Sequence, residues 1–345
     1  MIMQKQEISR RDFLKSSTLA SLGFISLQSK QVFENGGENN NLIGRVLFNY
    51  SSSFKQPDSK SEKYRIFKFN DLLNLKDPIL ISSRAVRQEV WYRLNAGDFI
   101  PTTSLQIVHK NLNKPVENIN RNGQLAEITV PFTTAWAGGA TEKKGDQTFF
   151  FGSTHWIYTL AEDHEGKRFY RIIEDRWNDT YYIEAAHMRV IPENDLTPIH
   201  AEVPLEEKSI RINLQEQIAI AYEGSEPVYL TSISSGLLTG DIDLTTPPGL
   251  FEINYKRPSR HMEHSDKFGV NDNALYGVPW VSYFTDTGIA FHGTYWHNDF
   301  SAPRSHGCIN LPIESARWIY LWTHPVVPPR EKKYVSNTGT VVDVT

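Results

Sequence analysis

The chain has 345 residues, of which 39% are hydrophobic and 12% aromatic, and its formal net charge is −4 at pH 7. This composition supplies enough apolar residues for a real core, and the length suits two or three domains. No long basic run is present, which argues against a protein that coats nucleic acid, and beyond the N-terminus no apolar stretch is long enough to span a membrane.

The N-terminal segment, residues 1–33, has the pattern of an export signal. The stretch SRRDFLK contains Arg10 and Arg11 and is followed by the weakly apolar run SSTLASLGFISL. A basic start before an apolar run shorter than the ~20 residues of a spanning helix is typical of a signal peptide. The twin arginine resembles the signal of the twin-arginine pathway, which carries folded proteins across the bacterial inner membrane. The alternative is an amphipathic first helix that starts with basic residues.

The resemblance to a twin-arginine signal implies export to the periplasm or the cell envelope. No Ala-x-Ala cleavage site is visible near residues 26–32, so anchoring in the membrane by an uncleaved signal stays open as well. Residues 34–43, which contain ENGGENNN, are predicted to form a flexible linker.

Two segments with similar patterns follow the linker. WYRLNAGDFIPTTSLQIV starts at Trp91, and FYRIIEDRWNDTYYIEAAHMRVI starts at Phe169. Each opens with aromatic-Tyr-Arg-aliphatic, and each then has an aromatic-Ile pair and a large apolar residue six positions after that aromatic. Short aromatic and β-branched runs broken by Gly, Asn and Asp predict small antiparallel strands. We therefore predict two compact β-barrels, over residues 44–122 and 129–200.

These two segments resemble bacterial SH3-like domains. Such domains often tether cell-wall enzymes to peptidoglycan, so the resemblance implies that the two barrels bind the cell wall. The alternative is a spacer that binds nothing, because a fold alone does not define a function.

Residues 208–345 are predicted to form a β-sandwich or mixed sheet. The run SIRINLQEQIAIAYEG starts at Ser209 and alternates apolar and polar residues, and VPWVSYFTDTGIAFHG gives two further strands around a turn. Near the C-terminus, PIESARWIYLW predicts a helix, with Pro312 in its first turn and Pro325 beyond its end. The whole chain is thus expected to be mostly β, with one short helix in its last part.

The single cysteine, Cys308, lies in the stretch SHGC just before the predicted helix. Exported proteins usually pair their cysteines, so a lone cysteine is either a small buried hydrophobe or a thiol kept for reactivity. A position before a helix N-terminus is expected to lower the thiol pKa. His292 ends a strand sixteen residues upstream. The loop between them can fold back, and the imidazole can then act as the base for a sulfur nucleophile.

Two further features of this stretch suit acyl transfer. Backbone N–H groups around Gly307 and Cys308 could stabilise an oxyanion, and Gly307 has no side chain to obstruct a substrate carbonyl. No acidic residue stands at an obvious place to orient the His292 imidazole, so a backbone carbonyl could serve.

The pattern HGT…SHGCIN resembles the signature of the L,D-transpeptidases of the YkuD type, over roughly residues 208–345. The TPPG turn from Thr246 to Gly249 is close to the TPxG of that family. The resemblance implies that Cys308 is the nucleophile and His292 the general base. It assigns to Gly293 the carbonyl that orients the imidazole. It assigns the shaping of the nucleophile loop to Ser305, His306 and Gly307. Many members have Arg two residues after the cysteine; this chain has Asn310, which also occurs in the family.

The resemblance also implies a substrate class. The donor would be a peptidoglycan tetrapeptide stem, whose carbonyl before the terminal D-Ala is attacked by Cys308, and the acceptor would be an amine of a second stem. No cofactor, metal or nucleic acid is implied. Four residues are candidates for the substrate cleft, namely Trp280, Tyr283, Trp296 and His297.

Three alternatives stay open. The same acyl-enzyme attacked by water would make the protein an L,D-carboxypeptidase or endopeptidase. His292, His297, His306 and Cys308 could instead hold zinc, although no Cys-x-x-Cys or His-x-x-x-His pair is present. The third alternative is a wall-binding protein without catalytic activity.

Overall fold

The computed structural model describes residues 42–82, 88–142, 144–240, 242–264 and 273–345. The predicted export signal, residues 1–33, lies outside the described residues, as does all but the end of the predicted linker, residues 34–43. The described chain is mostly β, as predicted, and its one α-helix is α3 (Ile313–Trp322). No helix among the described residues is long and apolar enough to cross a membrane.

The first part of the chain is an antiparallel sheet in the order β3-β2-β6-β5-β4-β1-β7. Its strands are β1 (Leu42–Val46), β2 (Ser51–Phe54), β3 (Lys63–Phe67), β4 (Leu72–Ser82), β5 (Gln88–Leu94), β6 (Phe99–Pro101) and β7 (Leu105–Val108). A short 3-10 turn, η1 (Thr102–Ser104), precedes β7. The sheet encloses its own apolar core, which includes Val46, Leu75 and Leu94.

The second part repeats this strand order as β10-β9-β13-β12-β11-β8-β14. Its strands are β8 (Gln124–Ile128), β9 (Phe132–Ala137), β10 (Lys144–Phe150), β11 (Thr154–Glu162), β12 (Arg168–Ile173), β13 (Thr180–Glu184) and β14 (Met188–Val190). Neither order closes into a ring, because the two outermost strands of each sheet have one partner only. In the described residues, the two units are therefore open antiparallel sheets and not the closed barrels expected from the sequence.

The residues that repeat in sequence are core residues of the two sheets. Ile100 and Ile183 have no exposed surface, and Leu105 and Met188 are at most 1% exposed. Tyr170 is also fully buried. The repeated pattern thus reflects equivalent buried positions in the two sheets, each of which must fill an apolar interior of its own.

The third part contains two five-stranded sheets. One has the order β17-β16-β15-β26-β20, and the other has the order β24-β23-β22-β21-β25. The first consists of β15 (Lys208–Asn213), β16 (Ile218–Glu223), β17 (Glu226–Ser232), β20 (Gly249–Glu252) and β26 (Val341–Val344). The second consists of β21 (Tyr255–His264), β22 (Asn273–Tyr283), β23 (Ala290–Gly293), β24 (Ile309–Leu311) and β25 (Tyr334–Val335). A small hairpin, β18 (Leu238–Thr239) with β19 (Ile242–Asp243), lies outside both sheets.

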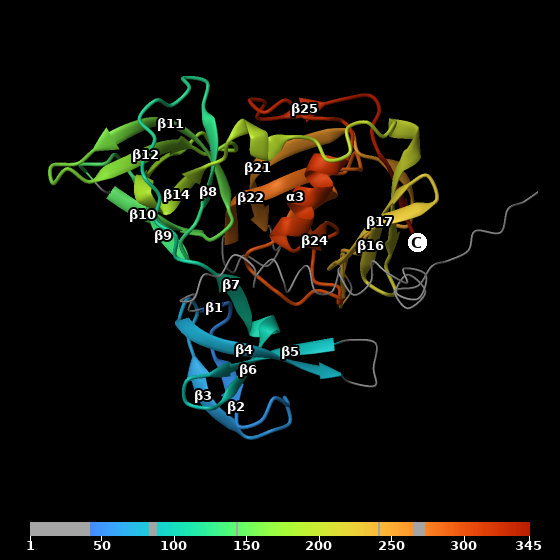
Figure 1. The fold of residues 1–345 in the computed structure, drawn as a ribbon, viewed down its shortest axis with the longest axis horizontal. Coiled ribbons are helices and arrows are strands. Elements are labelled where there is room, and N and C mark those ends of the chain that lie inside the picture. Colours follow the sequence, from blue (N-terminus) through green and yellow to red (C-terminus); the bar gives the residue numbers. More distant parts are fainter. Residues whose placement is uncertain (1–41, 83–87, 143, 241, 265–272) are drawn as a thin grey trace, which may run out of the picture.

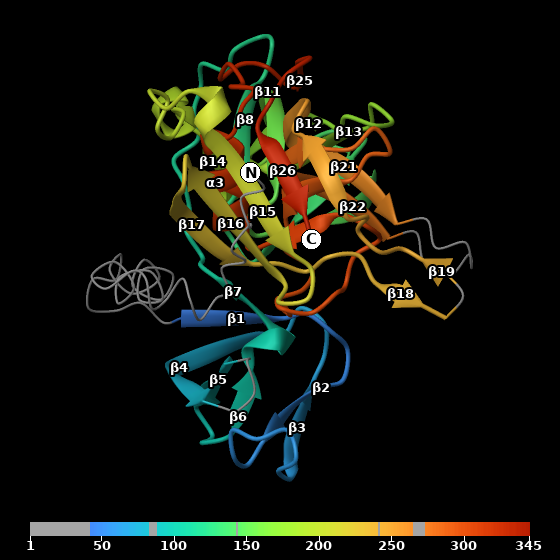
Figure 2. The same cartoon turned by 90° about the vertical axis from the view of Figure 1, so that its right-hand side faces the viewer.

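Helix α3 packs against both of these sheets (Figures 1 and 2). Its buried positions include Ala316 and Ile319, which share one apolar cluster with residues of both sheets. Trp318 stacks on Tyr229 of β17, with ring centroids 4.1 Å apart. The helix begins after Pro312, where the sequence predicted it. It supports the short strands β23 and β24, which carry the motifs identified above.

The first sheet lies below the other two parts in Figure 1, and the second lies beside the third. The second sheet is joined to the third part by buried hydrogen bonds: the Thr154 hydroxyl donates to the Pro258 carbonyl (2.7 Å), and the Ser259 hydroxyl donates to the Thr154 carbonyl (2.5 Å). The carboxylate of Asp175, in the turn after β12, bonds Arg260 at 2.7 Å. The parts therefore pack together through specific polar contacts.

Candidate active site

Two short parallel strands bring the histidine and the cysteine to one place. In the pairing of β23 with β24, His292 is opposite Asn310, and Cys308 stands immediately before β24. Side chains two residues apart on a strand point to the same face. Cys308 and Asn310 therefore share a face with His292, and His292 and Cys308 are diagonal neighbours. The opposite face carries Phe291, which packs into the core against α3.

The His292 ring is buried and oriented by the backbone. Its Nδ1 lies 3.2 Å from the carbonyl oxygen of Gly293, which is the contact that the resemblance implies. When Nδ1–H donates to this carbonyl, Nε2 carries the lone pair and can accept a proton. The space around Gly293 is tight, because a Cβ there would come within 2.8 Å of Pro279 Cγ. The absence of a side chain at this position thus lets the strand pack closely.

Cys308 is half-buried and packs against an apolar cluster of Val278, Val281 and Ala290, against which Tyr283 and Trp296 also pack. Desolvation by burial raises the pKa of this thiol, while the backbone N–H of Ala290 acts in the opposite direction. Its Sγ also donates to the Gly288 carbonyl oxygen at 3.9 Å. The expectation of a lowered pKa is wrong. Helix α3 begins five residues later, after a strand and a proline, so its positive end is not next to the sulfur.

The SHGC loop is fixed by its own hydrogen bonds. Gly307 has φ +117°, a conformation that favours glycine. Its N–H donates to the Ser305 hydroxyl oxygen (3.1 Å), and that hydroxyl donates to the Cys308 carbonyl (2.5 Å). The Gly307 N–H is therefore engaged within the loop, and stabilisation of an oxyanion by N–H groups around Gly307 and Cys308 stays a prediction. Ser305 and Gly307 shape the loop, whereas His306 is exposed to solvent.

Thr246 connects the TPPG turn to this loop. Its buried hydroxyl donates to the Gly307 carbonyl (2.8 Å) and accepts from the Gly236 N–H (2.9 Å). A Cβ at Gly236 would come within 2.0 Å of the Leu244 carbonyl oxygen and 2.8 Å of Gly307 Cα, so three segments meet there. The sequence reading noted the turn but missed the roles of Gly236 and of the Thr246 hydroxyl. Nothing local in the sequence indicates that these segments converge.

His297 anchors the loop between His292 and Cys308. It is 7% exposed, and its Nε2 lies 2.7 Å from the side-chain amide nitrogen of Asn310 on β24. Burial lowers the pKa of His297 to about 4, with a further contribution from the Arg304 charge. Although predicted to line the cleft, His297 is held inside the loop. Asn310 is thus a partner of this loop, a role that the sequence did not reveal.

The other three predicted cleft residues lie in two different environments. Trp280 is 1% exposed and packs in the main core, 5.4 Å from the ring of Tyr320, so its assignment to the cleft is wrong. Tyr283 and Trp296 are half-buried and belong to the apolar cluster that includes Cys308. Burial raises the pKa of Tyr283 to about 12.

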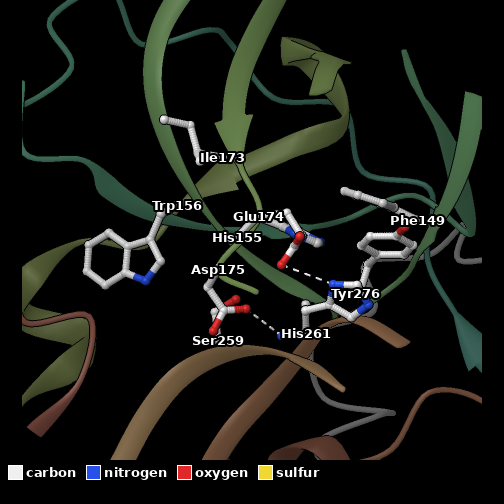
Figure 3. Close-up of a pocket in the computed structure, with 10 residues that line it drawn as sticks. Phe149, His155, Trp156, Ile173, Glu174, Asp175, Ser259, His261 and Tyr276 are labelled. Carbon is white, nitrogen blue, oxygen red and sulfur yellow. Dashed lines mark hydrogen bonds and ion pairs between the residues drawn. The ribbon is translucent and has the colours of Figure 1, made fainter. Parts of the chain in front are cut away.

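A separate cavity of about 20 Å³ lies between the second sheet and the third part (Figure 3). His261 and Glu174 face each other across it, with Nδ1 and Oε1 3.0 Å apart. The cavity has room for about one water molecule. It shares no lining residue with the surroundings of Cys308 and is too small for a peptide.

In the described ranges, no three His, Cys, Asp or Glu side chains are arranged to hold a metal ion, so the suggested zinc ligands do not form a set.

Comparisons with known proteins find a family match for the third part of the chain. Residues 207–344 match the family model of the YkuD L,D-transpeptidase catalytic domain. YciB of Bacillus subtilis (strain 168), which carries the name of an L,D-transpeptidase, is 35% identical over 121 residues, 32% of this chain and 58% of YciB. The match thus spans less than two thirds of that relative.

Solved structures give further similarities. The catalytic domain of the Enterococcus faecium L,D-transpeptidase is 22% identical, with a TM-score of 0.31 over 41% of this chain and 98% of that one. An L,D-transpeptidase from Mycobacterium smegmatis is 15% identical, with a TM-score of 0.32 over 78% of this chain and 100% of that one.

The third part of the chain, which carries His292 and Cys308, is the part that matches a known family of catalytic domains. Residues 207–344 belong to the YkuD family of L,D-transpeptidase catalytic domains.

Proposed function

We propose that this protein is a peptidoglycan L,D-transpeptidase in which Cys308 is the nucleophile and His292 the general base. The observation that carries the proposal is the parallel pairing of β23 with β24, which puts both side chains on one face. The Gly293 carbonyl supports it further, because it orients the imidazole with a hydrogen bond of 3.2 Å.

In the first half-reaction, Cys308 attacks the carbonyl before the terminal D-Ala of a tetrapeptide stem. Since burial keeps the thiol protonated, His292 accepts its proton as the sulfur–carbon bond forms. The tetrahedral intermediate then breaks the carbon–nitrogen bond, and the imidazolium returns the proton to the departing D-Ala amine. The product is a thioester between Cys308 and the tripeptide acyl group.

In the second half-reaction, an amine of another stem attacks the thioester. His292 takes a proton from that amine, the carbon–sulfur bond breaks, and the proton returns to the thiolate of Cys308. The half-buried rings of Tyr283 and Trp296 lie in the same apolar cluster as the sulfur, which favours amine over water at the thioester.

The remaining parts of the chain fit a cell-envelope enzyme. Residues 1–33 would export the folded chain to the periplasm or cell envelope. The first two sheets would bring the catalytic domain to the cell wall. A lone thiol suits that oxidising compartment, because it has no second thiol with which to form an internal disulfide.

The test is product analysis by mass spectrometry with a tetrapeptide stem fragment as both donor and acceptor. The proposal expects a cross-linked dimer as the main product and free tripeptide as the minor one, and neither with Cys308→Ala. If tripeptide dominated at millimolar stem concentration, the protein would be a carboxypeptidase. If neither product formed while labelled peptidoglycan still bound, a wall-binding role would replace both.

A further inference from the structure

The loop between His292 and Cys308 is held from outside the catalytic domain. Arg45, on β1 of the first sheet, donates from its guanidinium to the backbone carbonyl of Tyr295 at 2.6 Å. A second contact runs the other way, from the side-chain amide of Asn298 to the carbonyl of Thr102 at 3.2 Å. Figures 1 and 2 show this loop, in orange before β24, on the side of the third part that faces the first sheet.

Arg45 is placed for this contact by a network of neutral groups. It is 1% exposed. Its Nε and one terminal nitrogen donate to the Gln106 side-chain oxygen (3.0 and 2.7 Å), and the other terminal nitrogen donates to that of Asn70 (2.9 Å). Gln106 in turn donates to the carbonyl of Phe151 in the second sheet (3.0 Å). None of these described hydrogen bonds ends on a carboxylate, although a buried charge is usually paired with one. Such a costly arrangement points to a positioning role.

Tyr295 is fixed at three points. Its carbonyl accepts from Arg45, and its hydroxyl donates to the carbonyl of Tyr276 at 2.8 Å. Its ring stacks on Phe150 of the second sheet, with centroids 5.6 Å apart, and Phe150 also lies under the Arg45 guanidinium at 4.4 Å. All three parts of the protein therefore meet at this residue.

From Tyr295 the contacts lead directly to the proposed base. The ring of Tyr295 packs edge-on against Trp296, with centroids 5.0 Å apart. The ring of Trp296 lies 5.6 Å from that of His292, and Trp296 and Cys308 pack against the same buried apolar cluster. A shift of the Tyr295 backbone would displace Trp296, which contacts the proposed base and packs against the same buried cluster as Cys308.

We propose that Arg45 is a positioning residue for acyl transfer: it fixes the loop from Thr294 to Gly307 so that Trp296 and His292 keep their place beside Cys308. This inference rests on the proposed function. It gives the first sheet a part in catalysis besides any binding of the cell wall.

The test compares Arg45→Met with Arg65→Met in the full-length chain. Arg65 is in the same sheet and forms an ion pair with Asp98 at 2.7 Å, but its hydrogen bonds do not reach the loop. We expect Arg45→Met to lower kcat by ~10–100-fold with little change in KM, since small misplacements of reacting groups carry costs of this size. Hydrogen exchange of residues 294–307 should become faster. Arg65→Met should leave kcat and loop exchange at wild-type values.

Conservative substitution separates positioning from general stability. Arg45→Lys keeps a charged donor for the Tyr295 carbonyl and should restore part of the kcat and of the loop protection lost in Arg45→Met. If Arg45→Met failed to fold, Asn298→Ala would remove the second contact without leaving a buried charge. It should speed loop exchange and lower kcat by a smaller factor.

Wild-type kcat and wild-type loop exchange in a folded Arg45→Met or Asn298→Ala variant would overturn the inference. So would equal losses in Arg45→Met and Arg65→Met. If the wild-type chain formed no acyl-enzyme with tetrapeptide, the proposed function would fail, and the catalytic part of the inference would fail with it. Hydrogen exchange of residues 294–307 would still report separately whether Arg45 holds the loop.

Discussion

At the scale of single residues, the protonation state of Cys308 decides how the chemistry starts. Its surroundings are apolar and raise the thiol pKa, with one backbone N–H as the opposing group. This direction favours a neutral thiol over a preformed thiolate–imidazolium pair in the resting protein. In the proposed mechanism, His292 then removes the proton as the sulfur attacks.

This leads to a prediction for thiol alkylation. The rate of Cys308 modification by iodoacetamide should rise with pH through a midpoint above the usual range of a cysteine thiol, because only the thiolate reacts. Mass spectrometry of the protein at each pH gives the rate, and Cys308→Ala is the blank. A rate that is already maximal at neutral pH would contradict the neutral-thiol description.

The sequence predicts the Cys308–His292 pair because SHGC and the upstream His-Gly are local motifs, and the structure pairs the strands next to these motifs. Sequence reasoning assigned Trp280 to the cleft, whereas Trp280 is buried in the main core. Trp280 has φ +60°, and the alternation slips there: Val278 and Val281 pack beside Cys308, while Trp280 faces the main core. A backbone irregularity of this kind leaves no clear signal in the sequence.

At the scale of elements, the nucleophile loop depends on a segment some sixty residues earlier. The Thr246 hydroxyl joins the Gly236 N–H to the Gly307 carbonyl, and all three residues are brought together by the close approach of glycine backbones. The helix after Cys308 was predictable from its proline and its apolar period. The short strand β24 was not, because it depends on parallel pairing with β23 and on a bridge between Asn310 and Ser234, which lies far away in the chain.

We predict that Thr246→Val destabilises the protein by ~1–3 kcal/mol, because it leaves a buried N–H and a buried carbonyl without their partner. Urea unfolding measures the change. Thr245→Val is the matched control, since Thr245 is exposed and bonds only the neighbouring Asp243. Equal stability of the two variants would show that the Thr246 bridge contributes nothing.

At the scale of the whole molecule, two sheets of identical strand order flank a catalytic domain. The repeat was visible in the sequence because equivalent core positions carry similar residues. The contacts between the three parts could not be seen in the sequence, since Arg45, Phe150 and Tyr295 lie far apart in the chain. Such interfaces depend on tertiary packing, which local patterns do not encode.

Two buried histidines should make the assembled molecule sensitive to acid. Burial lowers the pKa of His155 to about 3 and that of His297 to about 4, whereas an unfolded histidine titrates near ~6.5. Below ~pH 6.5 the unfolded chain binds more protons than the folded one. Each histidine therefore costs ~1.4 kcal/mol per pH unit as the pH falls from there towards its folded pKa.

Thermal melts between pH 7 and pH 4 test this prediction. The wild-type Tm should fall as the pH falls, and His155→Gln should show a shallower slope. His164→Gln is the control, because His164 is exposed. Three identical slopes would show that His155 does not contribute to acid sensitivity.

The central claim is that Cys308 carries the acyl group and that His292 activates the Cys308 thiol. Trapping of the acyl-enzyme intermediate tests this claim most directly. The wild-type chain would be mixed with a tetrapeptide stem, quenched in acid and weighed intact, with the adduct mapped by peptide analysis. The account predicts a mass increase equal to the tripeptide acyl group on Cys308, none in Cys308→Ala, and ~10²–10⁴-fold slower formation in His292→Ala. An adduct on another residue, or cross-linked product formed by Cys308→Ala, would contradict it.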